Sequence, residues 1–168
     1  MKCYFRDIML PSTQKYIQVI AAIYFLCTAC KKEATPDPSP VQLLNAVNQL
    51  RQTGCTCGTT LMPPVPPLVW NDTLAIAAQG HVADMYTHNY FSHIAPDGSS
   101  PIQRAAEAGY KGNYVGEDLA MGYNTINAVM MAWQSSEDHC KAMMDTLYRE
   151  MGAAETHEYW ALEFGRYK

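Results

Sequence analysis

Four prolines stand close together in this sequence, in the stretch LMPPVPPLVW at residues 61–70. Prolines at this density preclude both a helix and a central strand, because each lacks a backbone N–H and fixes its own φ angle. We therefore expect an extended covering loop over residues 55–69. A polyproline ligand for another protein is the alternative. The covering loop is favoured because its apolar residues would lie against a core; they are Val65, Leu68, Val69 and Trp70.

Helices are predicted on both sides of this loop. Ser39 as N-cap and Pro40 as first residue begin one helix, and Gly54 ends it. Asn71 caps the next helix, with Asp72 in its first turn. Apolar residues at helical spacing give the two buried stripes, which are Leu43, Leu44, Val47 and Leu50 in the first and Leu74, Ala78, Val82 and Met85 in the second.

The second helix also carries three potential metal ligands, His81, Asp84 and His88. They fall at helical spacing on its polar side. No partner from a loop is evident beside them, so we predict a solvated face there instead of a metal site.

Three more helix starts follow. Ser100, Pro101 and Gln103 form a capping box that Gly109 terminates. Asn124 or Thr125 begins a helix with Ile126, Val129, Met130 and Trp133 directed inward. Residues 135–138 give a fresh cap, which puts His139 near the start of a short helix.

Two strands are predicted at the C-terminus, at residues 151–154 and 159–167. In the second, Trp160, Leu162 and Phe164 alternate with Tyr159, Ala161 and Glu163. This period of two is typical of a half-buried sheet.

The composition excludes some classes of protein. With 48% hydrophobic and 17% charged residues, the 168-residue chain is not disordered throughout. The net charge is −4, and removing residues 1–29 leaves 9 basic and 15 acidic residues, or −6. No run of Lys or Arg interleaves with aromatics, so nucleic acid is not an expected partner.

The N-terminus predicts export. Lys2, Arg6 and Lys15 precede an apolar run at residues 17–29 that is too short for a membrane span and suits a signal peptide. The signal, residues 1–30, ends in Leu-Cys-Thr-Ala-Cys, which resembles a bacterial lipobox with Cys30 as the lipidated residue. A short uncleaved anchor is the alternative. Residues 31–40 form a polar, proline-rich linker, and residues 41–168 form the domain.

Three cysteines remain beyond the signal: Cys55, Cys57 and Cys140. Cys55 and Cys57 are too close in sequence to bridge each other comfortably, so an oxidising compartment would pair Cys140 with one of them. A Cys-x-Cys plus His zinc site is the competing idea, although the spacing matches no standard zinc finger.

A histidine and a glutamate near loop signals form the first candidate site. His93 follows Phe91 and Ser92, and Glu117 stands between Gly116 and Asp118. Residues 110–116 are expected to form a loop that leads to Glu117. Side chains beside loops can converge on a cavity.

In chain order, these features resemble the CAP superfamily of cysteine-rich secretory, antigen 5 and pathogenesis-related proteins (SCP-like extracellular domains), especially its bacterial branch. The resemblance spans about residues 41–167. It rests on Pro67-Leu68-Val69-Trp70-Asn71, Phe91-Ser92-His93, Asp97-Gly98, Arg104, Gly109-Tyr110, Gly116-Glu117-Asp118-Leu119-Ala120, Trp133-x-x-Ser136-x-x-His139, Met151-Gly152 and Tyr159-Trp160. It implies an α+β fold, a three-layer α-β-α sandwich with a small central antiparallel sheet, and a cleft that gathers histidines and acids.

The resemblance also assigns site residues. His93 is similar to the family's first cavity histidine, and Glu117 to the acid of its Gly-Glu-Asn signature, here followed by Asp118. His139 would take the role of the second histidine. Ser136 stands where eukaryotic members have a second glutamate, so Ser136 and the neighbouring Glu137 are weaker candidates.

Binding is favoured over catalysis. His93, His139 and Glu117 suffice for a divalent metal such as zinc with an open position. The first hypothesis is a lipid-anchored module of the cell envelope whose cleft binds such a metal or a small apolar ligand. The alternative is a metal-assisted, peptidase-like hydrolase of extracellular or envelope polymers with Glu117 as general base. The sequence has no His-Glu-x-x-His or Gly-x-Ser-x-Gly motif. A purely structural His/Glu hydrogen-bond cluster is the third possibility.

Overall fold

The computed structural model describes residues 40–167. The predicted signal peptide, the linker up to residue 39 and the lipidation candidate Cys30 lie outside the described residues. No helix within residues 40–167 is long and apolar enough to span a membrane.

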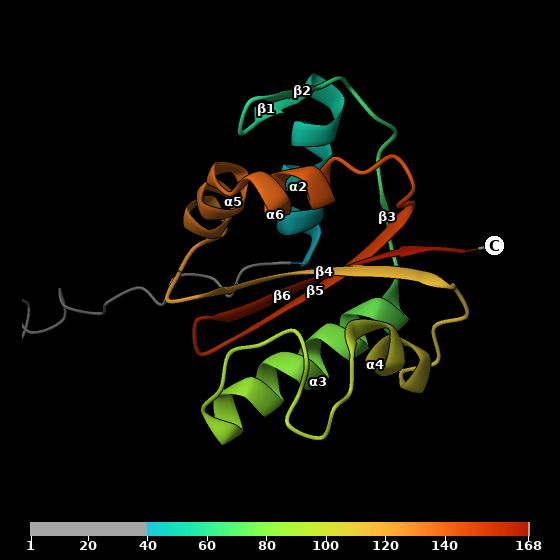
Figure 1. The fold of residues 1–168 in the computed structure, drawn as a ribbon, viewed down its shortest axis with the longest axis vertical. Helices are drawn as coiled ribbons and strands as arrows, with labels where there is room; N and C mark the ends of the chain where they lie inside the picture. Colours follow the sequence, from blue (N-terminus) through green and yellow to red (C-terminus); the bar gives the residue numbers. More distant parts are fainter. Residues whose placement is uncertain (1–39, 168) are drawn as a thin grey trace, which may run out of the picture. The chain divides into compact units, whose positions relative to one another are not determined.

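The described residues form three layers. The helices are α2 (Pro40–Thr53), α3 (Asp72–His88), α4 (Pro101–Glu107), α5 (Ile126–Ser135) and α6 (Glu137–Met143). The strands are β1 (Cys55–Cys57), β2 (Thr60–Met62), β3 (Val69–Trp70), β4 (Tyr114–Met121), β5 (Glu150–Thr156) and β6 (Tyr159–Arg166). A sheet in the order β3-β5-β6-β4 has α3 and α4 on one face and α2, α5 and α6 on the other (Figure 1). The predicted three-layer sandwich of α+β class is confirmed.

Three predicted helix starts, at Asn71, Ser100 and Thr125, are confirmed by their caps. The predicted N-cap Ser39 lies outside the described residues. The Asn71 side chain accepts hydrogen bonds from two backbone N–H groups of α3, at 3.0 and 3.2 Å. The backbone N–H of Ser100 donates to the Gln103 side chain at 2.9 Å, and Thr125 caps α5. These contacts satisfy N–H groups that have no partner within their own helix.

Strand β4 differs from the sequence prediction. A loop is predicted at residues 110–116, but Tyr114–Met121 pairs antiparallel with β6 over its whole length. Gly116, Glu117 and Asp118 have low strand propensity and break any alternation. The ladder with β6 overrides that local preference, so Glu117 is held on a strand and not in a loop.

The prediction of a half-buried C-terminal strand is also wrong. Residues 160–165 of β6 are all buried, because helices cover both faces of the sheet. The sheet is antiparallel except for the two-residue β3, which pairs parallel with β5.

The proline-rich segment is extended, as predicted, but it begins with a hairpin. Strands β1 and β2 pair antiparallel from Cys55↔Met62 to Cys57↔Thr60. Gly58, with a φ of +59°, stands in the tight turn between them. Val65 and Leu68 are buried, which confirms the covering role, whereas Val69 is exposed.

Candidate functional site

Glu117 is the centre of a polar network on the α3 side of the sheet. Its side chain is only 1% exposed. One carboxylate oxygen lies 2.7 Å from His93 Nδ1, and the other lies 2.7 Å from Arg104 Nη2. The predicted pair of His93 and Glu117 is thus brought together, with both glutamate oxygens already engaged.

Arg104 holds the loop after α3 against this network. Its Nη1 donates to the carbonyl oxygens of His93 and Ser99, at 3.0 and 2.9 Å. The short helix α4 supplies Arg104, and the capping box at Ser100 starts that helix. Arg104 therefore fixes the backbone of His93 as well as the carboxylate that His93 contacts.

His81 contradicts the prediction of a solvated face. It is 1% exposed, and its Nε2 lies 2.9 Å from the Ser92 carbonyl and 3.8 Å from Glu117. Burial lowers the pKa of His81, although the charge of Glu117 opposes this. The other two members of the predicted face behave as expected: the side chains of His88 and Asp84 are 63% and 38% exposed, and His88 Nδ1 lies 2.7 Å from an Asp84 carboxylate oxygen.

Glu163 is a site residue that the sequence interpretation missed. It stands directly opposite Glu117 in the β4–β6 ladder and is fully buried. Burial, followed by the charge of Glu117, raises the pKa of Glu163 well above its usual value. Neither Glu163 oxygen has a hydrogen-bond partner among the described residues, so the neutral, protonated acid is the favoured form.

Glu117 has the opposite charge state. Its burial disfavours the ionised form, but the hydrogen bond to His93 and the charge of Arg104 outweigh it, so the pKa of Glu117 is lowered. Glu117 is therefore ionised, whereas Glu163 is protonated and neutral.

Asp118 points to the other face of the sheet, where it is 1% exposed. One of its carboxylate oxygens has no hydrogen-bond partner. Burial and the charge of Glu117 raise the pKa of Asp118 well above its usual value.

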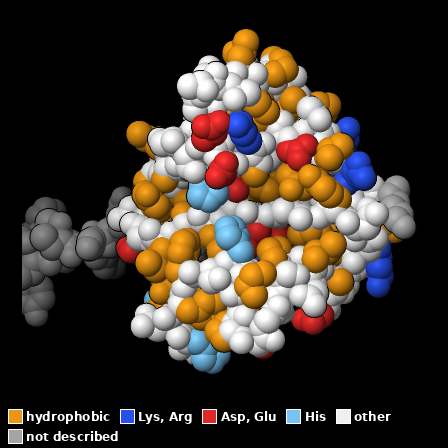
Figure 2. Space-filling view, viewed as in Figure 1, with side chains coloured by type: hydrophobic (Ala, Val, Ile, Leu, Met, Phe, Trp, Pro, Cys, Tyr) orange, Lys and Arg blue, Asp and Glu red, His pale blue; other side chains and the backbone are white. Residues whose placement is uncertain are grey.

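His139 borders a hollow of about 320 Å³. Burial, followed by the charge of His93, lowers the pKa of His139. Two histidine side chains lie close together near the centre of the face seen in Figure 2, among apolar side chains. The hollow is lined by Phe91, Leu119, Ala120, Met121, Tyr123, Ala132, Trp133, Ser136 and His139.

The two weaker candidates differ. Ser136 lines the hollow and is the N-cap residue of α6. Glu137 does not line it, and its carboxylate pairs with Lys141 at 2.5 Å on the surface of α6.

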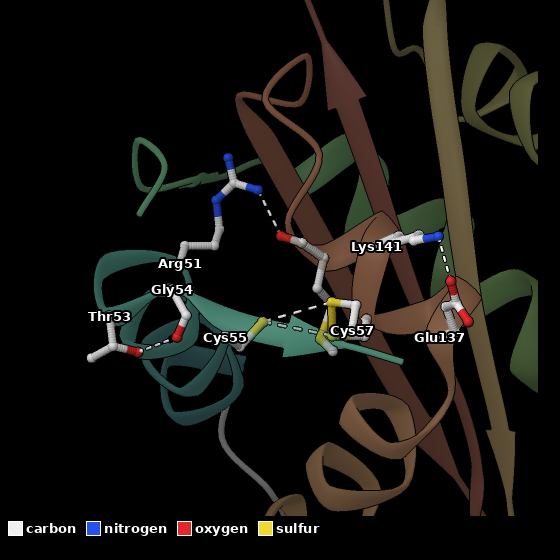
Figure 3. The surroundings of a disulfide bond; sticks show 9 residues. Arg51, Thr53, Gly54, Cys55, Cys57, Glu137 and Lys141 are labelled. Atoms are coloured by element: carbon white, nitrogen blue, oxygen red, sulfur yellow. Dashed lines mark hydrogen bonds and ion pairs between the residues drawn. A yellow bond between two sulfur atoms is a disulfide. The ribbon is translucent and has the colours of Figure 1, made fainter. Parts of the chain in front are cut away.

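The cysteines form a separate cluster. Cys57 and Cys140 are joined in a disulfide, which settles the partner left open by the sequence, and Cys55 is a free thiol (Figure 3). Within residues 40–167, these three cysteines are the only group of three or more His, Cys, Asp or Glu residues whose ligand atoms all lie within 4.8 Å of one another. His93, Glu117 and His139 are therefore not preassembled as three direct ligands of one ion.

Known proteins resemble this chain in sequence. A model of the cysteine-rich secretory protein family, CAP, matches residues 44–158. The uncharacterized membrane protein YlbC of Bacillus subtilis (strain 168) is 32% identical over 97 residues, which are 58% of this chain and 28% of that protein. The uncharacterized protein YkwD of the same organism is 31% identical over 100 residues, 58% of this chain and 39% of that protein. The chain thus matches well under half the length of either relative.

Solved structures share the fold. An extracellular protein containing a SCP domain from Bacillus anthracis superposes with a TM-score of 0.68 at 25% identity, over 75% of this chain and 39% of that one. An outer surface protein from Borrelia burgdorferi superposes with a TM-score of 0.64 at 24% identity, over 75% of this chain and 90% of that one.

Proposed function

This chain belongs to the CAP, or cysteine-rich secretory protein, family, and on that premise we propose that its domain is an exported binding module for a small amphipathic molecule. The observation that carries the proposal is the hollow of about 320 Å³, with apolar walls and His139 at its border. Phe91 and Met121 beside it are 46% and 49% exposed, so apolar surface is open to a ligand. Pockets for small molecules commonly combine apolar walls with a few polar groups that fix orientation.

The walls of the hollow are held by the fold. The Trp133 indole donates to the Leu119 carbonyl at 3.1 Å, which ties α5 to β4. The Trp160 indole donates to the Tyr123 carbonyl at 2.6 Å. An apolar chain or ring would occupy the hollow, and a polar end would hydrogen-bond to the imidazole of His139.

Two methionines give a matched test. Met121 lines the hollow, whereas Met131, 64% exposed on α5, does not. Octanoate and octanol are titrated calorimetrically into the protein without its signal peptide. The two ligands have alkyl chains of the same length and different head groups, so together they separate the contribution of the alkyl chain to the affinity from that of the head group. Met121→Asp should weaken binding about tenfold, since losing an apolar contact worth about 1.4 kcal/mol has that effect. Met131→Asp should bind as the wild type does.

The proposal fails if the wild type binds neither octanoate nor octanol. It also fails if both aspartate variants weaken binding equally, because the loss would then come from charge and not from the hollow.

A divalent ion is the second candidate ligand. His93 contacts Glu117 through Nδ1, so its Nε2 is available to bind a metal ion. Metal-binding histidines are commonly oriented by a carboxylate at the other ring nitrogen. His93 and His139 would then bind the ion, with Glu117 behind His93. Zinc affinity that is lost in His93→Gln but kept in Met121→Asp would favour the ion over the amphipathic ligand. A metal-assisted hydrolase would depend on this second candidate.

We also propose that the domain works outside the cytoplasm, held at the envelope by a lipid on Cys30. The names of the relatives support this location, since one is called extracellular, one an outer surface protein and one a membrane protein.

A further inference from the structure

Three sulfur atoms gather where the β1–β2 hairpin meets α6. The Cys55 Sγ lies 3.6 Å from the Cys57 Sγ and 3.6 Å from the Cys140 Sγ. Figure 3 shows the Cys55 side chain directed at the disulfide. None of the three cysteines lines the hollow beside His139, so this cluster is distinct from the proposed ligand site.

The local fold explains this convergence. Cys55 and Cys57 are two residues apart on β1, and residues at that spacing project from the same side of a strand. Cys140 faces them from α6, where it is 1% exposed. A Cys-x-Cys strand opposite one helical cysteine therefore places three sulfur atoms at one point.

The position of Cys55 distinguishes two uses of a third sulfur. Attack on a disulfide requires the thiolate to approach along the extension of the S–S bond. Cys55 is equally far from both sulfurs, so it lies beside the middle of the bond and not on its extension. Sulfurs bound to one tetrahedral ion at metal–sulfur distances near 2.3 Å lie ~3.8 Å apart. The two distances to Cys55 are close to that spacing.

We propose that Cys55, Cys57 and Cys140 form a redox-gated site for one thiophilic metal ion, such as Zn(II), Cd(II) or Cu(I). An external dithiol opens the site by giving two electrons and two protons to the Cys57–Cys140 disulfide, and the dithiol itself becomes a disulfide. The three thiols then release their protons as they bind the ion. Oxidation of Cys57 and Cys140 closes the site and releases the ion.

The Cys55 thiol gives the proposed site a dependence on pH. Burial raises the pKa of the Cys55 thiol, so metal must displace its proton, and the affinity should increase with pH.

Cadmium alone is the probe, because its bonds to thiolates give an ultraviolet charge-transfer absorption. The full chain is used, with Cys3, Cys27 and Cys30 replaced by serine so that they cannot bind cadmium. After anaerobic reduction with a phosphine, we expect one cadmium per chain. The Cys55→Ser variant in the same background should lose at least tenfold in affinity, and the oxidised protein should bind no cadmium with high affinity.

Thermal unfolding tests cadmium binding even if reduction of the disulfide destabilises the folded protein. Cadmium should raise the melting temperature of the reduced protein by several degrees, because a ligand that binds only the folded state stabilises it. Cadmium should raise the melting temperature of reduced Cys55→Ser much less. Cooperative unfolding of the oxidised variant, which keeps the Cys57–Cys140 disulfide, verifies that the variant folds. Equal affinity in the two reduced proteins, or no uptake by the reduced parent, would overturn the proposal.

Discussion

At the scale of single residues, the site depends on two adjacent acids in different charge states. Glu117 is ionised because His93 and Arg104 compensate it, whereas Glu163 behind it keeps its proton. A second ionised carboxylate next to Glu117 would have no cation of its own. His93 is thus oriented by one ionised carboxylate, which is only 1% exposed, while the imidazole itself is 52% exposed.

Asp118 provides a prediction at this scale. Its pKa is raised in the folded chain, so the folded state holds a proton that the unfolded state loses above the ordinary aspartate value of 3.8. Stability therefore decreases as pH rises through that range. Asp118→Asn cannot ionise, and we expect it to be more stable than the wild type by at least about 1 kcal/mol at pH 8, because a pKa raised by one unit corresponds to about 1.4 kcal/mol.

Urea unfolding at several pH values measures this. The gain should shrink towards zero below about pH 3, where both states of the wild type are protonated. Asp138→Asn, at an exposed position on α6, is the matched control. A gain for Asp118→Asn that is the same at about pH 3 and at pH 8 would contradict the electrostatic explanation.

The sequence identified part of this site. His93, Glu117 and His139 could be named because each stands in a short motif. Glu163 could not, because its position opposite Glu117 depends on strand register, which local sequence does not define. His81 could have been found from spacing alone, since it lies three residues after Ala78 and four before Met85 on the buried stripe.

At the scale of elements, α3 packs unusually close to β5. A Cβ atom at Gly152 would overlap the backbone of Leu74 and Ala75. The backbone of a helix cannot move aside as a flexible side chain can. This contact sets the distance between α3 and the sheet, and thereby the position of His81 relative to Glu117.

Two glycines test this packing. Gly152→Ala should destabilise the protein by about 3 kcal/mol, at the upper end for overpacking a core. Gly80→Ala on α3 meets no atom within 4 Å and should stabilise by about 0.5–1 kcal/mol, because alanine favours a helix over glycine. Denaturant unfolding of both variants measures the difference. Similar effects of the two substitutions would show that close packing is not what Gly152 provides.

Helices were easier to predict than strands in this chain. Asn71, Ser100 and Thr125 mark helix starts through side-chain caps that depend only on neighbouring residues. Strand β4 has no such signal, because its stability comes from pairing with β6, more than thirty residues further along the chain. The β1–β2 hairpin was missed because prolines follow it and only three residues pair on each strand.

At the scale of the whole molecule, the proposed arrangement is a folded domain joined to a membrane by a lipid and a short linker. The resemblance to a family predicted the three-layer sandwich in full, since that layering could not be deduced from local patterns. The location remains a prediction, because residues 1–39 lie outside the described part of the chain.

Substitutions at Cys30 and Cys27 test whether the protein is lipidated at Cys30. Cells that express the full chain are labelled with radioactive palmitate and then separated into membrane and soluble fractions. Cys30→Ala should abolish the label and move the protein out of the membrane fraction, because each buried methylene of an acyl chain contributes about 0.8 kcal/mol to anchoring. Cys27→Ala, three positions earlier, should keep both. Label retained in Cys30→Ala would rule out lipidation at that residue.

The disulfide has one more consequence, for a protein exposed to proteases. It joins residues that are 83 positions apart, and the segment between them contains His93, Glu117 and His139. A single cut in the exposed turn at residues 96–98 would separate His93 from Glu117 along the chain. The two fragments would still be linked covalently, so a nicked molecule would keep all of its cleft residues for as long as Cys57 and Cys140 stay oxidised.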